Sequence, residues 1–323
     1  MTCGILLLDK PLGLSSSGAT QRVRRLLRLD KAGHVGSLDP LATGMLPICL
    51  GEATKLAGEV LEGAKTYSFR IALGSRTATG DTEGEIVESR PVPPLDRTRI
   101  LGVLASFLGE SLQVPPMYSA LKRNGRPLYE LARAGVTVER AARPIRIDSF
   151  ELVGLGDDGL DCRVVCGKGT YVRTLAEDVA AALGTCGHVA RLRREAVEPF
   201  DPAGMITLAN LENGRSEGLP LGLIPADQAV GHLAAVHLDA GAARRIGMGQ
   251  TVVLPPLELP PLPSDTAGDV VQNALPAAAD VTVRLYGPQA VFLGLGAVAP
   301  GGRVRPKRLF AASAPPTQSP DGE

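Results

Sequence analysis

The sequence lacks any long hydrophobic run. No apolar stretch approaches the roughly 20 residues that a membrane-spanning helix needs. Residues 5–8 are apolar, but they are too few for a signal peptide and no basic leader precedes them. An excess of charge is also missing, because 34 basic residues balance 34 acidic ones. Total charge therefore gives no argument for nucleic-acid binding, which could rest only on local basic clusters. We expect a cytoplasmic protein that does not bind a membrane.

Cysteines are few and odd in number. The five cysteines form no paired framework, which fits free thiols in a reducing compartment and excludes a disulfide scaffold. Cys162, Cys166, Cys186 and His188 could be offered as zinc ligands. Cys162 and Cys166, however, fall on one face of an alternating, strand-like segment, where buried cysteines behave as small apolar residues. We predict no metal site.

Nucleotide-binding loops are missing too. The sequence contains no Walker A motif. The GxGxxG string at residues 154–159 is followed by no helix, and its two acidic residues would repel a pyrophosphate. We predict a hairpin turn at this string, between strands over 145–153 and 160–165, and we expect no cofactor.

The chain is long enough for two domains with separate cores, since it has 323 residues of which 44% are hydrophobic. The apolar pattern predicts strands over 4–8 and 65–74. It predicts one helix that begins at the serines 15–17 and another over 96–108. Strands and helices are thus mixed along the chain, as in an α+β protein.

The most informative stretch runs from His34 to Lys55. Its centre, GSLDP at 36–40, places the carboxylate of Asp39 in a short turn, because the following proline restricts the aspartate to extended or turn conformations. Most Asp-Pro pairs only cap a turn. The dipeptide alone therefore leaves two roles open for Asp39, turn capping and contact with a substrate.

The longer string favours contact with a substrate. ILLLDKP at 5–11, followed by GHVGSLDPLATG at 33–44, resembles the N-terminal signature of the TruB family of tRNA pseudouridine synthases. In that family the aspartate of the second string is the nucleophile, and this position falls on Asp39. The resemblance also implies that His34 packs in a loop that rearranges around the extruded base. A surface histidine with satisfied hydrogen bonds is the alternative.

Another motif of the family recurs at 167–175, GKGTYVRTL. In the family, its arginine forms a salt bridge with the nucleophilic aspartate and its tyrosine lies in the same pocket. The resemblance therefore implies these roles for Arg173 and Tyr171. The chemistry agrees, because a guanidinium beside Asp39 would keep the carboxylate ionised and would orient it.

Two shorter strings complete the resemblance. KTYSF at 65–69 resembles the motif whose tyrosine packs against the target base, which implies this role for Tyr67. HVARLRR at 188–194 resembles the segment whose leucine lines the uracil site, which implies this role for Leu192. On the residues alone, Tyr67 would be an ordinary half-buried strand aromatic.

Further parts resemble the RNA-binding regions of the family. Residues 113–143 resemble the RNA-clasping insertion called the thumb, and their basic and tyrosine side chains suit phosphate contacts and base stacking. Residues 229–310 resemble, more loosely, a β-rich PUA domain with a Pro/Ala-rich insert at 254–278. We expect a disordered tail over 311–323. The basic residues expected to contact RNA are Lys10, Lys122, Arg123, Arg126, Arg303, Arg305, Lys307 and Arg308.

The resemblance implies an α+β catalytic domain over 1–228, with a mixed, mainly antiparallel sheet, flanking helices and the insertion. It implies a monomeric enzyme that binds the T-arm of tRNAs and isomerises the loop uridine at position 55. Two alternatives remain: a tRNA-binding or tRNA-folding protein whose Asp39 is structural, and a guide-RNA-dependent synthase of the dyskerin type. The sequence also leaves open whether Asp39 attacks the ribose, attacks the base or deprotonates the sugar.

Overall fold

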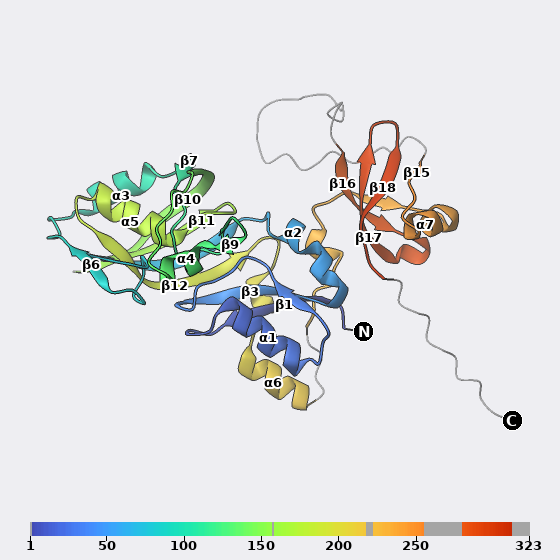
Figure 1. Ribbon diagram of the computed structural model, residues 1–323, viewed down its shortest axis with the longest axis horizontal. Helices are drawn as coiled ribbons and strands as arrows, with labels where there is room; N and C mark the ends of the chain where they lie inside the picture. The colour runs from blue at the N-terminus through green and yellow to red at the C-terminus, as the bar shows by residue number, and fades with distance from the viewer. Residues whose placement is uncertain (1, 157, 218–221, 255–279, 312–323) are drawn as a thin grey trace.

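The computed structural model describes residues 2–156, 158–217, 222–254 and 280–311. In these ranges a large mixed sheet with helices is followed by a small β-rich domain (Figure 1). Most of the predicted insert and of the predicted tail lies outside the described residues. None of the helices in the described ranges has the length and apolar character to cross a bilayer.

The larger sheet contains nine strands in the described residues, in the order β13-β1-β3-β12-β4-β11-β10-β7, with β2 paired to β3. The ladders β1–β13 and β3–β12 are parallel and the others are antiparallel, which confirms the mixed, mainly antiparallel sheet. Its strands are β1 (Gly4–Lys10), β2 (Ala32–His34), β3 (Ala42–Leu50), β4 (Lys65–Leu73), β7 (Gly109–Gln113), β10 (Arg143–Gly156), β11 (Gly159–Cys166), β12 (Gly187–Val197) and β13 (Ile206–Thr207).

Helices cover the sheet at both of its ends. Ser15 caps α1 by accepting a hydrogen bond from the Gly18 N–H at 3.1 Å, as predicted from the serine cluster. Near the other end, α3 packs on β10 and α5 packs on β12. The helices are α1 (Ser16–Leu26), α2 (Ala57–Val60), α3 (Arg97–Ala105), α4 (Leu128–Arg133), α5 (Val172–Ala182), α6 (Leu208–Ser216) and α7 (Ala240–Gly247).

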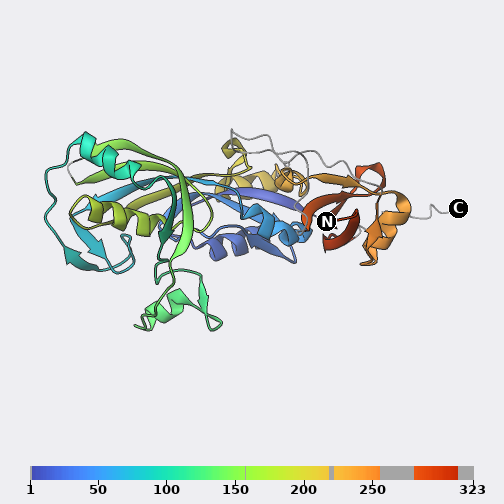
Figure 2. The same cartoon turned by 90° about the horizontal axis from the view of Figure 1, so that it is seen from above.

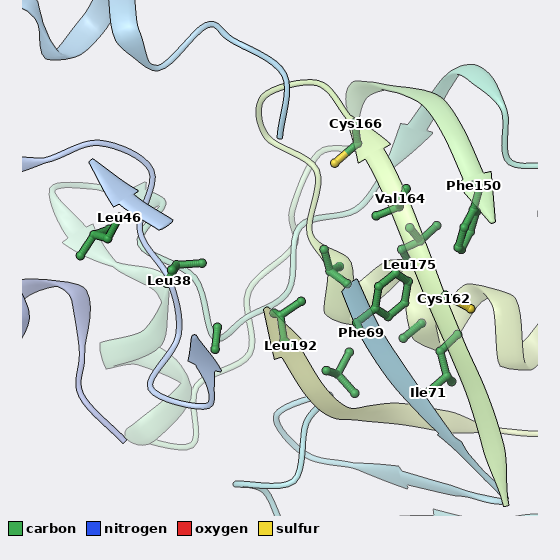
Figure 3. Close-up of a cluster of buried hydrophobic side chains, with 14 of the residues drawn as sticks. Leu38, Leu46, Phe69, Ile71, Phe150, Cys162, Val164, Cys166, Leu175 and Leu192 are labelled. Carbon is green, nitrogen blue, oxygen red and sulfur yellow. The ribbon is translucent and has the colours of Figure 1, made fainter. Parts of the chain in front are cut away.

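The main core lies between the sheet and these helices, and Figure 3 shows part of it. Phe69 of β4 and Phe150 of β10 pack there with ring centroids 6.0 Å apart. Cys162 and Cys166 are fully buried free thiols in the same core, as the alternating pattern predicted. The predicted hairpin between β10 and β11 is confirmed, because both strands reach into the GxGxxG string and pair there.

An insertion leaves the sheet between β7 and β10, whose last paired residues are Gln113 and Arg143. It projects from the body of the protein (Figure 2) and contains α4 and a short hairpin of β8 (Lys122–Arg123) and β9 (Arg126–Pro127). The two residues of the hairpin turn, Asn124 and Gly125, have φ values of 50° and 81°. A type I′ turn requires positive φ at both positions, which asparagine and glycine tolerate. A second small pair is formed by β5 (Ser75–Thr77) and β6 (Ile86–Ser89).

The C-terminal domain is a five-stranded sheet in the described residues, in the order β14-β16-β17-β18-β15, with α7 beside it (Figure 1). The strands are β14 (Ala235–His237), β15 (Val252–Val253), β16 (Val281–Tyr286), β17 (Phe292–Ala299) and β18 (Arg303–Leu309). Leu295 of β17 is fully buried, in a cluster with Ile5 and Ala53 of the larger domain. The Lys55 ammonium donates to the Leu309 carbonyl at 2.6 Å across the same junction. The two domains therefore share a core.

Candidate active site

Asp39 lies in the turn between β2 and β3. The hydroxyl of Ser16, the first residue of α1, accepts from the Leu38 N–H at 2.7 Å and donates to the Leu38 carbonyl at 2.9 Å. Leu38 itself is buried in the core, so the residue before the aspartate is held from both sides. The Asp39 side chain keeps 39% of its surface exposed. The turn therefore presents a fixed carboxylate that solvent, and so a substrate, can reach.

Arg173 of α5 forms an ion pair with this carboxylate. Its Nε lies 2.9 Å from Asp39 Oδ2, and its Nη2 lies 3.3 Å from Oδ1. The guanidinium is only 6% exposed and also donates to the carbonyls of Thr79, at 2.7 Å, and Tyr118, at 2.6 Å. Such a fork matches the geometry of a carboxylate and fixes its orientation. The two residues that the resemblance pairs are thus in contact.

A second carboxylate faces Arg173, and the sequence did not single it out. Asp81 is 2% exposed, and its Oδ2 lies 3.7 Å from the Arg173 Nη1. The Thr79 hydroxyl, at 2.5 Å, and the Glu83 N–H, at 3.1 Å, both donate to Asp81 Oδ1. The run TATGD at 77–81 is readable only as a turn, since nothing in it indicates an arginine far along the chain.

The charge state of Asp39 reflects several neighbours. Partial removal from water raises the pKa of Asp39 above its usual value, the positive charge of Arg173 opposes the rise, Asp81 adds to it and Lys10 opposes it. The expected effect of the Arg173 guanidinium, which favours the ionised carboxylate, is thus one of several effects on Asp39. The arginine opposes the rise in pKa but does not reverse it.

Lys10 is the clearest departure from the sequence-based interpretation. Its side chain is fully buried, and its ammonium donates to the carbonyls of Leu14, Pro11 and Pro40, at 2.6, 2.9 and 3.5 Å. Burial lowers its pKa to about 8, although the negative charge of Asp39 opposes the change. The predicted contact of Lys10 with RNA phosphates is wrong for this structure, because the ammonium ties the chain around Asp39 together instead.

The other predicted pocket residues lie on three separate elements. Tyr67 lies on β4 beside Arg194 of β12, and burial raises the pKa of its phenol. Tyr171 directly precedes α5, and its N–H donates to the Gln113 side chain at 2.8 Å. Leu192 of β12 is buried in the core. Tyr171 thus stands two residues before Arg173 at the start of α5. Tyr67 and Leu192 lie on two paired strands.

His34 is held by two hydroxyls. Its Nδ1 lies 3.0 Å from the Thr20 Oγ1, and its Nε2 lies 3.1 Å from the Ser37 Oγ. Burial, and secondarily the charge of Arg194, lowers the pKa of its imidazole. In this structure His34 is therefore a satisfied histidine at the foot of the Asp39 turn. A role in base extrusion would require it to leave these partners.

Two cavities are lined by residues of the site, and one of them borders Arg173. One, of about 320 Å³, lies between the loop 77–80 and the root of the insertion at 114–118, with Arg173 in its wall. The other, of about 620 Å³, is lined mainly by apolar surface and includes Leu192, Leu41 and Phe69. Both therefore adjoin elements of the site, and both are large enough to admit parts of a nucleotide.

The remaining basic residues predicted to contact RNA are exposed. Arg123 and Arg126 flank the hairpin turn of the insertion beside Lys122. On β18, Arg305 pairs with Asp280 and Lys307 pairs with Glu59 at 3.0 Å. The exposed members of this set are Lys122, Arg123, Arg126, Arg303, Arg305, Lys307 and Arg308.

Comparison with known proteins identifies the family. Residues 24–172 match the profile described as TruB family pseudouridylate synthase (N terminal domain). Residues 173–230 match the tRNA pseudouridylate synthase B C-terminal domain, and residues 234–310 match the profile described as Pseudouridine synthase II TruB, C-terminal. The last match agrees with the PUA-like character of the small domain.

Individual relatives agree with the family profiles. A protein of Aromatoleum aromaticum named tRNA pseudouridine synthase B is 46% identical over 98% of this chain and 95% of its own length. One of the same name from Cupriavidus taiwanensis is 47% identical over 95% of this chain and 93% of its own length. A solved structure titled Crystal Structure of a Cbf5-Nop10-Gar1 Complex shares the fold, with a TM-score of 0.70 at 24% identity over 95% of this chain and 85% of that one. The chain therefore belongs to the TruB family of pseudouridylate synthases.

Proposed function

We propose that this pseudouridine synthase acts on tRNA, where it isomerises the uridine at position 55 of the T-loop, and that Asp39 carries out the chemistry. The enzyme class follows from the family, and the relatives from Aromatoleum aromaticum and Cupriavidus taiwanensis are named for tRNA. The position in the tRNA and the role of Asp39 are inferences from the resemblance of the motifs. We also propose that the protein is a monomer, acts in the cytoplasm and binds the T-arm of the tRNA.

The observation that supports the role of Asp39 best is its ion pair with Arg173. The carboxylate is 39% exposed while the guanidinium is 6% exposed. The reactive group is therefore reachable, whereas the group that orients it is fixed. Preorganisation of this kind lowers a barrier because the enzyme need not rearrange charged groups during the reaction.

The reaction breaks the N1 glycosidic bond, rotates the uracil and forms a new bond from C5 to the ribose. It is an isomerisation, so it needs no oxidant, reductant or energy source. Ionised Asp39 has the chemistry to attack the ribose, to attack the base or to remove a proton from the sugar. In each case the uridine must first leave the RNA stack, which costs a few kcal/mol.

The proposal assigns the neighbouring residues to holding the extruded base and the RNA. Tyr67, Tyr171 and Leu192 would pack around the uracil, and His34 would support the extruded conformation. The basic side chains of the insertion and of β18 would contact phosphates and so position the T-arm without reading sequence.

Tritium release from C5-labelled uridine tests the proposal, because the C5 proton is displaced when the new carbon–carbon bond forms. The purified protein, without guide RNA, should release tritium from an unmodified tRNA transcript and from an isolated T-arm hairpin. A transcript with cytidine at position 55 should yield none. Modification of full tRNA but not of the hairpin would contradict recognition of the T-arm alone.

Two other outcomes would replace the proposal by the alternatives. Tight binding of tRNA without tritium release under any condition would indicate a binding or folding protein. Release only in the presence of a guide RNA would indicate a guide-dependent synthase.

A further inference from the structure

Arg194, near the end of β12, is the largest side chain that the structure buries completely, with 1% of its surface exposed. Its Nε donates to the Met45 carbonyl and its Nη2 donates to the Gly36 carbonyl, both at 2.7 Å. Tyr67 is its register partner on β4, and the charge of Arg194 opposes the rise that burial causes in the pKa of the Tyr67 phenol. No carboxylate of the described residues forms an ion pair with it. The guanidinium is thus a buried cation bound only by neutral oxygen atoms.

A buried cation without a counterion is costly. The penalty for removing a charged group from water is several kcal/mol, and an apolar side chain of similar volume would avoid it. Hydrogen bonds from a charged donor offset part of this penalty. Packing alone therefore does not account for an arginine at this position.

Both carbonyl oxygens that Arg194 binds belong to elements of the site. Gly36 lies in the turn that carries Asp39, and Met45 lies on β3, the strand that follows the turn. Tyr67 pairs with Arg194 in register across β4 and β12. The guanidinium thus connects the turn of the carboxylate to β3, and its own strand carries it opposite the tyrosine assigned to the base.

The turn is built to receive this arginine. Gly36 has a φ of +68°, a backbone conformation that residues other than glycine rarely adopt. A Cβ at this position would also lie 3.0 Å from the Arg194 Nη1. Glycine is therefore needed both for the path of the turn and for the approach of the guanidinium.

We propose that Arg194 is a positioning residue for the reaction, whose guanidinium fixes the Asp39 turn against β3, beside the strand that carries Tyr67. The inference rests on the proposed roles of Asp39 and Tyr67. Arg194 itself touches no reacting atom. Loss of the two hydrogen bonds from its guanidinium should therefore let the Asp39 turn move, while the surfaces that bind tRNA stay unchanged.

The experiment compares Arg194→Met and Arg194→Lys with Lys65→Met. Lys65 is a matched control, because it is another buried cation whose ammonium donates only to backbone carbonyls, those of Leu61 and Gly63. Thermal melts establish that each variant is folded. Single-turnover tritium release at saturating enzyme then measures chemistry, and filter binding measures tRNA affinity.

Arg194→Met should slow single-turnover chemistry about 10²-fold, the effect expected of a misplacement of about 1 Å, with tRNA affinity near that of the wild type. Arg194→Lys keeps the charge and much of the stem but cannot span both carbonyls, so it should fold and still be slow. Lys65→Met should be destabilised but should react at the wild-type rate. A wild-type rate in Arg194→Lys, or an equal loss in Lys65→Met, would overturn the inference.

The pKa of His34 gives a second readout, because it responds to the charge of Arg194. The charge of Arg194 contributes, after burial, to the lowered pKa of His34. The chain has only four histidines, so the His34 resonances can be assigned by comparison with His34→Gln. The pKa of His34, measured by NMR, should rise in Arg194→Met and stay low in Arg194→Lys. An unchanged value in Arg194→Met would also overturn the inference. A wild-type protein that releases no tritium from any tRNA would instead refute the proposed function.

Discussion

The substitution Asp81→Asn isolates the second carboxylate at Arg173. Asparagine keeps the oxygen that accepts hydrogen bonds from Thr79 and from the Glu83 N–H, so the loop should keep its conformation. What changes is one negative charge, 3.7 Å from the Arg173 Nη1. The variant therefore tests whether Asp81 helps to hold the arginine that orients Asp39.

The expected size of the effect follows from the geometry. Two opposite charges about 4 Å apart attract by about 4 kcal/mol at an effective dielectric constant of about 20. The cost of burying the Asp81 carboxylate offsets part of this attraction. Arg173 also keeps Asp39 and two carbonyls as partners. We expect a net loss of about 1.5–3 kcal/mol, typical of a hydrogen bond to a charged group, or about 10- to 10²-fold in rate if the loss falls on the transition state.

The pH dependence should change in a defined direction. Asp39 must be ionised to act, so activity falls as the pH drops through its pKa. Asp81 contributes to raising the pKa of Asp39, and removal of that charge lowers it. The acid limb of the pH–rate profile of Asp81→Asn should therefore lie at lower pH than in the wild type, although the plateau is lower.

Single-turnover tritium release across pH measures both effects. Asp96→Asn is the control, because Asp96 only caps α3 and asparagine caps a helix equally well. A plateau equal to that of the wild type, or an acid limb displaced to higher pH, would refute the reasoning.

Four further outcomes are expected. Lys10→Met should move the acid limb to higher pH, because the charge of Lys10 lowers the pKa of Asp39; a shift to lower pH would contradict this. Asp39→Asn should bind tRNA with near wild-type affinity but release no tritium, and a rate above about a hundredth of wild type would be explicable by acid–base assistance alone. Leu295→Ala should cost about 2–5 kcal/mol of unfolding free energy in a denaturant titration, as for other fully buried leucines. Arg303→Ala should weaken tRNA binding and reduce the salt slope of the affinity by about one, with an unchanged single-turnover rate.

Local periodicity predicted much of the fold. The alternation over 65–74 became β4, the serine cap began α1, and the string at 154–159 became a hairpin turn. The segment 42–50 was not predicted as a strand, because Gly44 and Pro47 both disfavour regular structure. Gly44 is needed at this point because a Cβ would lie 2.1 Å from the Arg194 carbonyl oxygen. The strand exists because tertiary packing overrides local preference.

Only those residues of the site that belong to recognisable sequence motifs could be predicted. Asp39 and Arg173 are 134 residues apart, and in the sequence only the family resemblance indicates that they interact. Asp81 and Arg194 were missed because their significance is their distance from other side chains, which no local pattern encodes. Lys10 was misplaced because its burial depends on carbonyls that the fold brings around it.

The shared core between the two domains has a consequence for how such proteins can be rebuilt. Leu295, flanked by Phe292 and Phe310, completes the apolar cluster that contains Ile5 and Ala53. A chimera that received a foreign RNA-binding module in place of residues 234–310 would leave this part of the catalytic domain open to water. Grafts should therefore succeed only when they carry the three apolar side chains along, and natural exchange of this module should be limited by the same requirement.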